Sequence, residues 1–209
     1  MGWLHQELDH WPDAIDSYTK AIQLAPQLTA AYNNRGIART TEGKPDAAIQ
    51  DYAKAIELNP RFAYAYGNRG SARYQQGKLD AAIQDYAKAI ELNPQDAAAY
   101  SARGDTRYAE NDLAAAIRDY DKAIEPKPQD ASLYQKRGLV HYAQGHVIAA
   151  IQDYDKAIDL IPSYSDAYIG RGVTRFAQGA LQTLYKTMTR PSSSIRNTPA
   201  PTATGAALA

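Results

Sequence analysis

The strongest constraint on this chain is a pattern that repeats every 34 residues. Residues 63–96, AYAYGNRGSARYQQGKLDAAIQDYAKAIELNPQD, have close copies on both sides. Glycines and prolines keep the same step, at Gly36, Gly70, Gly104, Gly138 and Gly172, and at Pro26, Pro60, Pro94, Pro128 and Pro162. A fixed period of this size indicates stacked supersecondary units that bury their apolar faces against one another.

Each unit is predicted to be two antiparallel helices joined by a turn of three or four residues. In residues 63–96 we expect helices over 64–76 and 80–92. Gly77 stands where a left-handed C-terminal cap is needed, and Asp80 is the expected N-cap of the second helix. Pro94 ends that helix because it disfavours helical angles at the residue before it. The cap position holds Gly43, Asn111, Gly145 and Gly179 in other units.

Small residues predict that the two helices of a unit pack closely. Gly70 of the first helix recurs with Ala82 and Ala89 of the second, and large residues such as Tyr66 and Tyr86 alternate with them. Small residues facing large ones at helical spacing let two helices interdigitate.

The pattern resembles the tetratricopeptide repeat, in the bacterial type whose units contain Asn-Arg-Gly. Tyr66, Gly70, Ala82, Tyr86 and Pro94 match the family pattern, and the resemblance covers residues 1 to about 179. It implies an all-α, right-handed superhelical solenoid of antiparallel helix pairs. Arginine replaces the family's leucine and tyrosine on the first helix at two positions, which in residues 63–96 are 69 and 73.

The units are unequal along the chain. Residues 1–28 form a partial amino-terminal unit, 29–164 four full units, 165–189 a degenerate sixth unit, and 190–209 a tail rich in Pro, Ser, Thr and Ala that is predicted to be disordered. Residues 3–8 would be the remnant of a first helix, and 13–24 the second helix. A start within a unit favours a truncated chain over a naturally short cap.

Two features disturb the pattern near its end. In the third full unit, Pro126 is expected to end the second helix about one turn early. After Gly179, the expected Ala-Ala-Ile-x-Asp-Tyr run is missing. Helically spaced residues are predicted to form a makeshift cap over the last helix instead: Leu181, Leu184, Tyr185 and Met188. A solenoid without a polar cap exposes apolar surface, which leaves end-to-end self-association open.

Composition argues against several functional classes. The net charge is zero, with 23 basic and 23 acidic residues, so nucleic acid is a poor default partner. Cysteine is absent, and none of the four histidines is paired at three or four residues, so we expect no metal site. No signal peptide and no run of 18 apolar residues is found, which predicts a cytoplasmic chain without membrane insertion.

The 34-residue period explains the residues that could otherwise be taken for a catalytic motif. Recurring aspartates look like a catalytic set, but they are one structural position copied: Asp51, Asp85, Asp119 and Asp153. No Gly-rich phosphate loop and no serine nucleophile elbow occurs, so we expect neither enzyme activity nor a cofactor. Each aspartate has a first-helix arginine in its own unit, at Arg35, Arg69, Arg103 and Arg137. We predict a partly buried ion pair across the helices or to a neighbouring unit.

Most of the 16 tyrosines fall at three repeat positions. Two of these positions are predicted to be core, at Tyr32, Tyr66, Tyr100, Tyr134 and Tyr168, and at Tyr18, Tyr52, Tyr86, Tyr120 and Tyr154. The third set lies on the opposite face of the first helix, at Tyr74, Tyr108 and Tyr142, with Phe176. The resemblance places this face on the concave side of the superhelix.

The resemblance therefore implies a peptide-binding groove lined by Asn33, Ile37, Tyr64, Ser71, Tyr74, Ser101, Asp105, Tyr108, Gln135, Leu139, Tyr142, Ile169, Val173 and Phe176. The competing interpretation is that the aromatic rings only pack against the next unit. The predicted function is a protein-protein interaction scaffold that binds a peptide or a partner helix. The alternatives are a targeting or regulatory arm of a larger protein or enzyme, and a self-assembling structural module.

Overall fold

The computed structural model describes residues 11–189, with side chains as far as residue 182. These residues form ten α-helices and no strand, which confirms the predicted all-α solenoid. The helices are α1 Trp11–Leu24, α2 Thr29–Thr41, α3 Pro45–Leu58, α4 Ala63–Gln75, α5 Leu79–Leu92, α6 Ala97–Ala109, α7 Leu113–Ile124, α8 Ala131–Ala143, α9 Val147–Leu160 and α10 Ser165–Thr189. The predicted helix remnant at 3–8 and the predicted tail at 190–209 lie outside the described residues.

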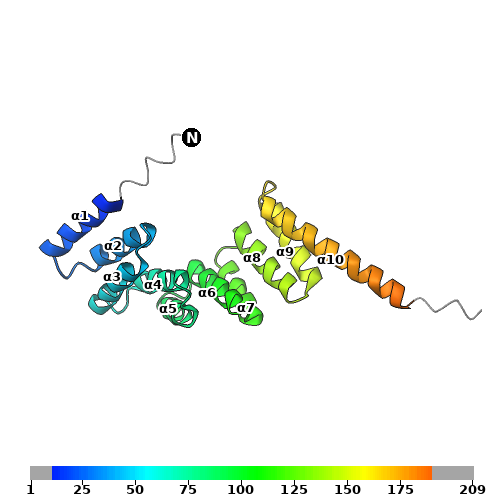
Figure 1. Ribbon diagram of the computed structural model, residues 1–209, viewed down its shortest axis with the longest axis horizontal. Coiled ribbons are helices and arrows are strands. Elements are labelled where there is room, and N and C mark those ends of the chain that lie inside the picture. Colours follow the sequence, from blue (N-terminus) through cyan, green and yellow to red (C-terminus); the bar gives the residue numbers. More distant parts are fainter. Residues whose placement is uncertain (1–10, 190–209) are drawn as a thin grey trace, which may run out of the picture.

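The helix pairs follow one another along the long axis, from α1 at one end to α10 at the other (Figure 1). We call α2, α4, α6, α8 and α10 the first helices, and α1, α3, α5, α7 and α9 the second helices. First helices of neighbouring units contact each other, α2 with α4, α4 with α6, and α8 with α10. Among the described residues no two second helices are in comparable contact, so the first helices lie on the more crowded side of the stack.

The turns within pairs have the predicted left-handed residue. The backbone φ angle is positive at Gly43, Gly77, Asn111 and Gly145. Asn is the non-glycine residue that tolerates this conformation best. The predicted N-cap Asp80 is wrong, because α5 begins one residue earlier and Lys78 is its N-cap. Asp80 still lies in the first helical turn, where a negative charge favours the helix dipole.

α10 differs from the prediction for the sixth unit. Gly179 does not end the helix, which continues unbroken to Thr189. Residues 181–188 therefore extend the last helix and do not fold back as a cap over it, and Leu181 is exposed. The overhanging part of α10 and the first turn of α9 border a hollow of about 600 Å³. α7 has 12 residues and ends at Ile124, whereas α5 has 14. The helix before Pro126 is therefore two residues shorter, which is less than the predicted full turn.

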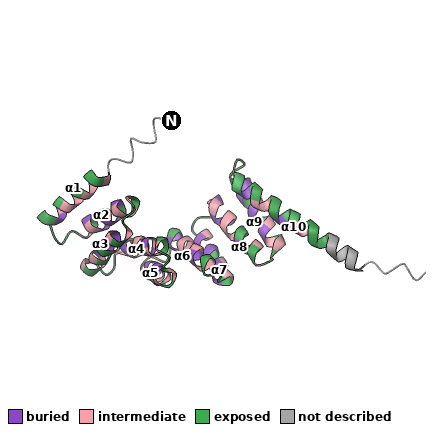
Figure 2. Ribbon diagram, in the orientation of Figure 1, coloured by how far each residue is buried: buried purple, intermediate pink, exposed green. Residues whose placement is uncertain are grey.

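The core is built from alanine and tyrosine at the contact between the helices of a pair. Tyr52, Tyr86, Tyr120 and Tyr154 of the second helices are buried. Figure 2 shows the buried residues where helices face each other, and α10 mostly exposed. The predicted core tyrosines of the first helices, Tyr32 to Tyr168, are less buried, and their exposed fraction ranges from 9 % at Tyr134 to 44 % at Tyr168. The glycines explain the close approach, since a Cβ atom on Gly70 would lie 2.9 Å from Cε1 of Tyr86.

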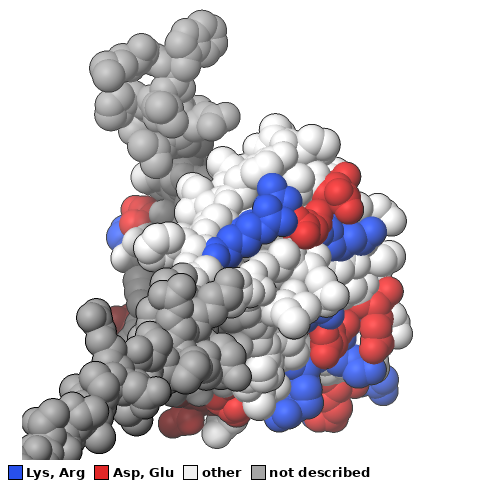
Figure 3. Space-filling view, turned by 90° about the vertical axis from the view of Figure 1, so that its right-hand side faces the viewer, with Lys and Arg blue, Asp and Glu red and all other residues white. Residues whose placement is uncertain are grey.

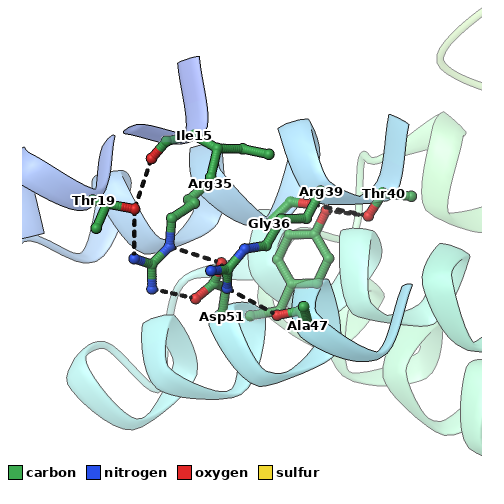
Figure 4. Close-up of polar contacts among 9 residues, drawn as sticks. Ile15, Thr19, Arg35, Gly36, Arg39, Thr40, Ala47 and Asp51 are labelled. Atoms are coloured by element: carbon green, nitrogen blue, oxygen red, sulfur yellow. Dashed lines mark hydrogen bonds and ion pairs between the residues drawn. The ribbon is translucent and has the colours of Figure 1, made fainter. Parts of the chain in front are cut away.

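The predicted ion pairs form between the two helices of each full unit. Figure 4 shows Arg35 and Arg39 of α2 converging on Asp51 of α3, with Thr19 of α1 beside Arg35. Arg35 donates from Nε and Nη2 to the two carboxylate oxygens, at 3.0 and 2.7 Å, and Arg39 donates from Nη1 at 2.7 Å. Asp51 is buried, so three charge-assisted hydrogen bonds offset its loss of hydration.

The close packing predicts opposite effects for two glycines of α4. Gly70→Ala should destabilise the fold by ~1–3 kcal/mol, because its Cβ atom collides with the Tyr86 ring. Gly67→Ala is the control, since its Cβ atom meets nothing within 4 Å, and it should stabilise the helix by ~0.5–1 kcal/mol. Urea unfolding measures both. Equal effects of the two substitutions would contradict the packing.

The ion pairs predict non-additive losses. Asp85→Ala leaves Arg69 and Arg73 without their shared acceptor and should cost ~3–5 kcal/mol. Arg69→Ala should cost less, because Arg73 still donates to the carboxylate at 2.8 Å. The double substitution should cost less than the two single losses together. Denaturant unfolding of all four proteins gives the coupling energy, and simple additivity would refute the pairing.

Candidate functional site: the inner face of the first helices

We define the inner face as the fourteen residues predicted to line the groove. The structure places them on five first helices. They are Asn33 and Ile37 on α2; Tyr64, Ser71 and Tyr74 on α4; Ser101, Asp105 and Tyr108 on α6; Gln135, Leu139 and Tyr142 on α8; Ile169, Val173 and Phe176 on α10.

Half of these side chains are large, apolar and exposed: Ile37, Tyr64, Tyr74, Leu139, Ile169, Val173 and Phe176. They concentrate towards the carboxyl end of the array, where α10 contributes three, and Phe176 is 80 % exposed. A contiguous exposed apolar surface commonly marks an interaction site. Figure 3 looks at the α10 end, where much of the visible surface in the upper half is uncharged apart from one basic stripe that ends beside acidic residues.

The predicted aromatic row is not uniformly exposed. Tyr74 is exposed, but Tyr108 packs against a buried cluster from α7 and α8 that includes Tyr120. Tyr142 likewise packs against the cluster around Tyr154 of α9. The prediction that all three rings face away from the core is therefore wrong for two of them. The cluster that Tyr108 contacts comes mainly from α7 of its own unit, and Val140 of α8 is its contribution from the next unit.

Polar groups fill the middle of the inner face. Asp105 accepts a hydrogen bond from the Tyr120 hydroxyl at 2.7 Å and pairs with Nζ of Lys136 at 2.6 Å. Burial, followed by the nearby Asp105 carboxylate, raises the pKa of Tyr120. The cluster borders a hollow of about 310 Å³ between α6 and α8, lined by Ala97, Ala98, Ser101, Ala102, Asp105, Lys127, Asp130, Ser132, Leu133 and Lys136.

Other polar members of the predicted set are already bonded within the protein. Asn33 is only 5 % exposed, and its Oδ1 accepts from Nδ2 of Asn68 at 2.9 Å. Ser71 accepts from the Tyr86 hydroxyl at 3.1 Å. Sequence reasoning missed Asn68 and Lys136, which link neighbouring first helices. Both occupy the repeat position before the arginine, and a polar residue there in three units, with Asn34 as the third, was the available signal.

Two histidines meet although their spacing did not suggest it. The rings of His141 on α8 and His146 at the start of α9 lie 5.8 Å apart. His141 takes the place of the second arginine, with its Nε2 3.9 Å from Asp153, and burial lowers its pKa. Among the described residues, no group of three or more potential metal ligands comes together. In the same part of the chain, no helix is both long and apolar enough to cross a bilayer.

Sequence models of repeat families match the chain over most of its helices. A model described as TPR repeat matches residues 70–109 and 104–145. Three models described as tetratricopeptide repeat match residues 29–62, 52–84 and 131–164. The chain belongs to the tetratricopeptide repeat family. This family of stacked helix pairs serves protein-protein interaction, so membership supports a scaffold whose partners are proteins or peptides.

Solved structures of tetratricopeptide repeat proteins are similar to this array. MamA is 28% identical, with a TM-score of 0.69 over 74% of this chain and 91% of that chain. YrrB is 21% identical, with a TM-score of 0.67 over 81% and 87%. The C-terminal part of a repeat protein from Cytophaga hutchinsonii is 21% identical, with a TM-score of 0.73 over 82% and 67%. No curated protein matches the sequence.

The weak pairing of His141 predicts a stabilising substitution. His141→Arg restores the arginine of the other units, and a second donor to Asp153 should add ~1 kcal/mol. The lowered pKa of His141 means that the unfolded chain binds the proton more readily, so the parent should lose stability as the pH falls below 6.5, the ordinary value. Denaturant unfolding at neutral and acidic pH tests this. The His141→Arg variant should lose less stability on acidification, because it lacks the imidazole. An equal loss of stability in both proteins would show that His141 does not cause the pH dependence.

Proposed function

We propose that the inner face binds an extended peptide or a helix presented by a partner protein. The observation that carries the proposal is the exposed apolar surface of Leu139, Ile169, Val173 and Phe176 on two adjacent first helices. Both helices pack against α9, which positions this surface on the array. The structure of YrrB is described as having an unusual peptide-binding site, which supports peptide binding by an array of this kind.

The proposed ligand is apolar where it meets α8 and α10 and polar towards the middle of the array. Ser101 and Gln135 are half-buried and can bond to a peptide backbone beside the hollow between α6 and α8. The charges nearby are largely paired, as between Asp105 and Lys136. Binding should therefore depend weakly on salt, since few unpaired charges are available for screening.

The proposed role involves no chemistry at the recurring aspartates. Asp51, Asp85 and Asp119 each accept hydrogen bonds from two arginines, and all three are buried. A carboxylate held in this way stabilises the contact between the two helices of its unit. We therefore propose a scaffold and not an enzyme.

A matched pair of isoleucines tests the proposed face. Peptides selected from a randomised library against the full chain would be titrated against variants by calorimetry. Ile169→Ala, on the inner face, should weaken binding by ~1–2 kcal/mol, as for an apolar anchor. Ile148→Ala, equally exposed on the second helix α9, should leave affinity unchanged. Tyr74→Ala should also weaken ligands that reach α4.

Thermal melting separates binding from folding in this test. Ile169 and Ile148 are 64% and 69% exposed, so neither substitution should lower the melting temperature. Tyr108→Ala should lower it, because that ring is packed in a core cluster. If selected peptides bind Ile169→Ala and the parent equally but lose affinity for Ile148→Ala, the ligand surface is the outer side and the proposal is wrong.

A further inference from the structure

Within residues 11–189, no second helix follows the first helix α10, whereas each full unit provides one. We define the end face of α10 by Tyr168, Gly172 and Arg175, which occupy the repeat positions that face the second helix in other units. The four full units show what normally covers each of these positions. Comparison with them therefore describes the partner that would fit.

The glycine position is filled by a tyrosine ring in every full unit. A Cβ atom built on Gly36, Gly70 or Gly104 would lie 2.6, 2.9 or 3.0 Å from the tyrosine ring of the second helix. On Gly138 it would lie 3.2 Å from the ring of Tyr154. A Cβ atom on Gly172 meets nothing within 4 Å. α10 thus presents an open seat for a tyrosine ring.

At the arginine position of the end face, the aspartate partner found in the full units is also missing among the described residues. Arg39, Arg73 and Arg107 each donate Nη1 to the aspartate of their second helix, at 2.7, 2.8 and 2.9 Å. Arg175 is exposed, and none of the described residues pairs with it. Arg171 differs, because it bonds to Asp155 of α9. One cation of the end face is therefore free to receive a carboxylate.

The tyrosine position is open as well. Tyr134 of α8 packs in the cluster of Ala150, Tyr154, Ala157 and Ile158, all from its own second helix, and is 9% exposed. Tyr168 is 44% exposed. The difference matches the absence of a second helix with small residues at the contact. Apolar area remains to be buried at this position.

We propose that the end face of α10 binds an amphipathic helix of another protein with the pattern Ala-x-x-Asp-Tyr-x-x-Ala. This pattern is shared by α3, α5, α7 and α9. The tyrosine ring lies over Gly172, the aspartate accepts from Arg175, and the alanines allow close approach to Tyr168. The bound helix takes the place of a second helix and completes the sixth pair. This surface is separate from the inner face and does not depend on the function proposed for it.

A second copy of the chain supplies a poorer partner. Among the described residues, which begin at Trp11, no first helix precedes the second helix α1. Its residues that match the pattern are Ala14, Ser17, Tyr18 and Ala21. Ser17 replaces the aspartate that Arg175 requires. The second helices of the full units carry the aspartate, but each is already packed against its own first helix. The charge complementarity therefore favours a helix from a different protein.

The test uses a fluorescein-labelled peptide with the sequence of residues 78–94, KLDAAIQDYAKAIELNP. Titration of the full chain should raise the anisotropy with saturation, and circular dichroism should show a gain of helix. Arg175→Glu should weaken binding by about tenfold, the effect of one hydrogen bond to a charged group. Gly172→Leu should weaken it at least as much, because the new side chain fills the seat of the tyrosine ring. Neither should lower the melting temperature, since both positions are exposed.

Matched controls identify the surface. Arg118→Glu, on an exposed residue of α7, and Gly67→Leu, on a helical glycine with open space on α4, should leave the affinity unchanged. A peptide with asparagine in place of the aspartate that corresponds to Asp85 should bind the parent about tenfold more weakly but should be insensitive to Arg175→Glu. This pattern would show that the aspartate and Arg175 contact each other.

Three results would overturn the proposal. The first is no binding at about 1 mM peptide, the limit of useful affinity. The second is a loss of binding with Gly67→Leu but not with Gly172→Leu, which would place the peptide on the inner face. The third is a mass of the chain alone that rises with concentration and returns to that of the monomer in Gly172→Leu. In that case a second copy, and not a foreign helix, occupies the end face.

Discussion

The contact of one tyrosine ring with one glycine backbone determines how close the two helices of a unit lie. A Cβ atom on Gly70 would lie only 2.9 Å from the ring of Tyr86, and the Tyr86 hydroxyl donates a hydrogen bond to Ser71 beyond this contact. In the next unit the equivalent hydroxyl, that of Tyr120, donates to Asp105. The core tyrosines thus place hydrogen-bond donors at the inner face. The packing that builds the array also orients part of the surface proposed to bind a ligand.

The buried aspartate adds register to this close packing. Each of three aspartates is held by a bidentate arginine and by a second arginine one turn away. A shift of one helix along the other would therefore leave the aspartate and both arginines without their partners. A buried ion pair adds little net stability over an apolar contact, but losing one partner is costly. In a chain whose units are nearly identical, this penalty favours each second helix pairing with its own first helix. The arginine also stacks on a tyrosine of the same helix, with Cζ of Arg69 5.6 Å from the Tyr66 ring centroid.

The period made the helices, the turns and the ion pairs predictable, because each depends on contacts within one unit that the sequence repeats several times. Features that depend on the neighbouring unit were harder to predict. The burial of Asn33 follows from Asn68 on the next first helix, and the half-buried Tyr108 contacts a cluster to which the next unit contributes Val140 of α8. Gly179 does not end its helix, because residues 180–188 lack the second-helix pattern of the other units and continue α10 instead. The fourteen predicted residues lie on the first helices, but the exposure of their side chains could not be predicted from one unit.

The two proposed surfaces meet on α10, so occupancy of one has consequences for the other. Ile169, Val173 and Phe176 belong to the inner face, whereas Tyr168, Gly172 and Arg175 belong to the end face of the same helix. In a solenoid each unit is stabilised mainly by its neighbours. Among the described residues, α10 has neighbours on one side only, namely α8 and α9. A helix docked on the end face would hold α10 from the other side and restrict its motion relative to α8. The inner face would then lose less conformational entropy on binding a peptide, so the two partners would bind with positive cooperativity.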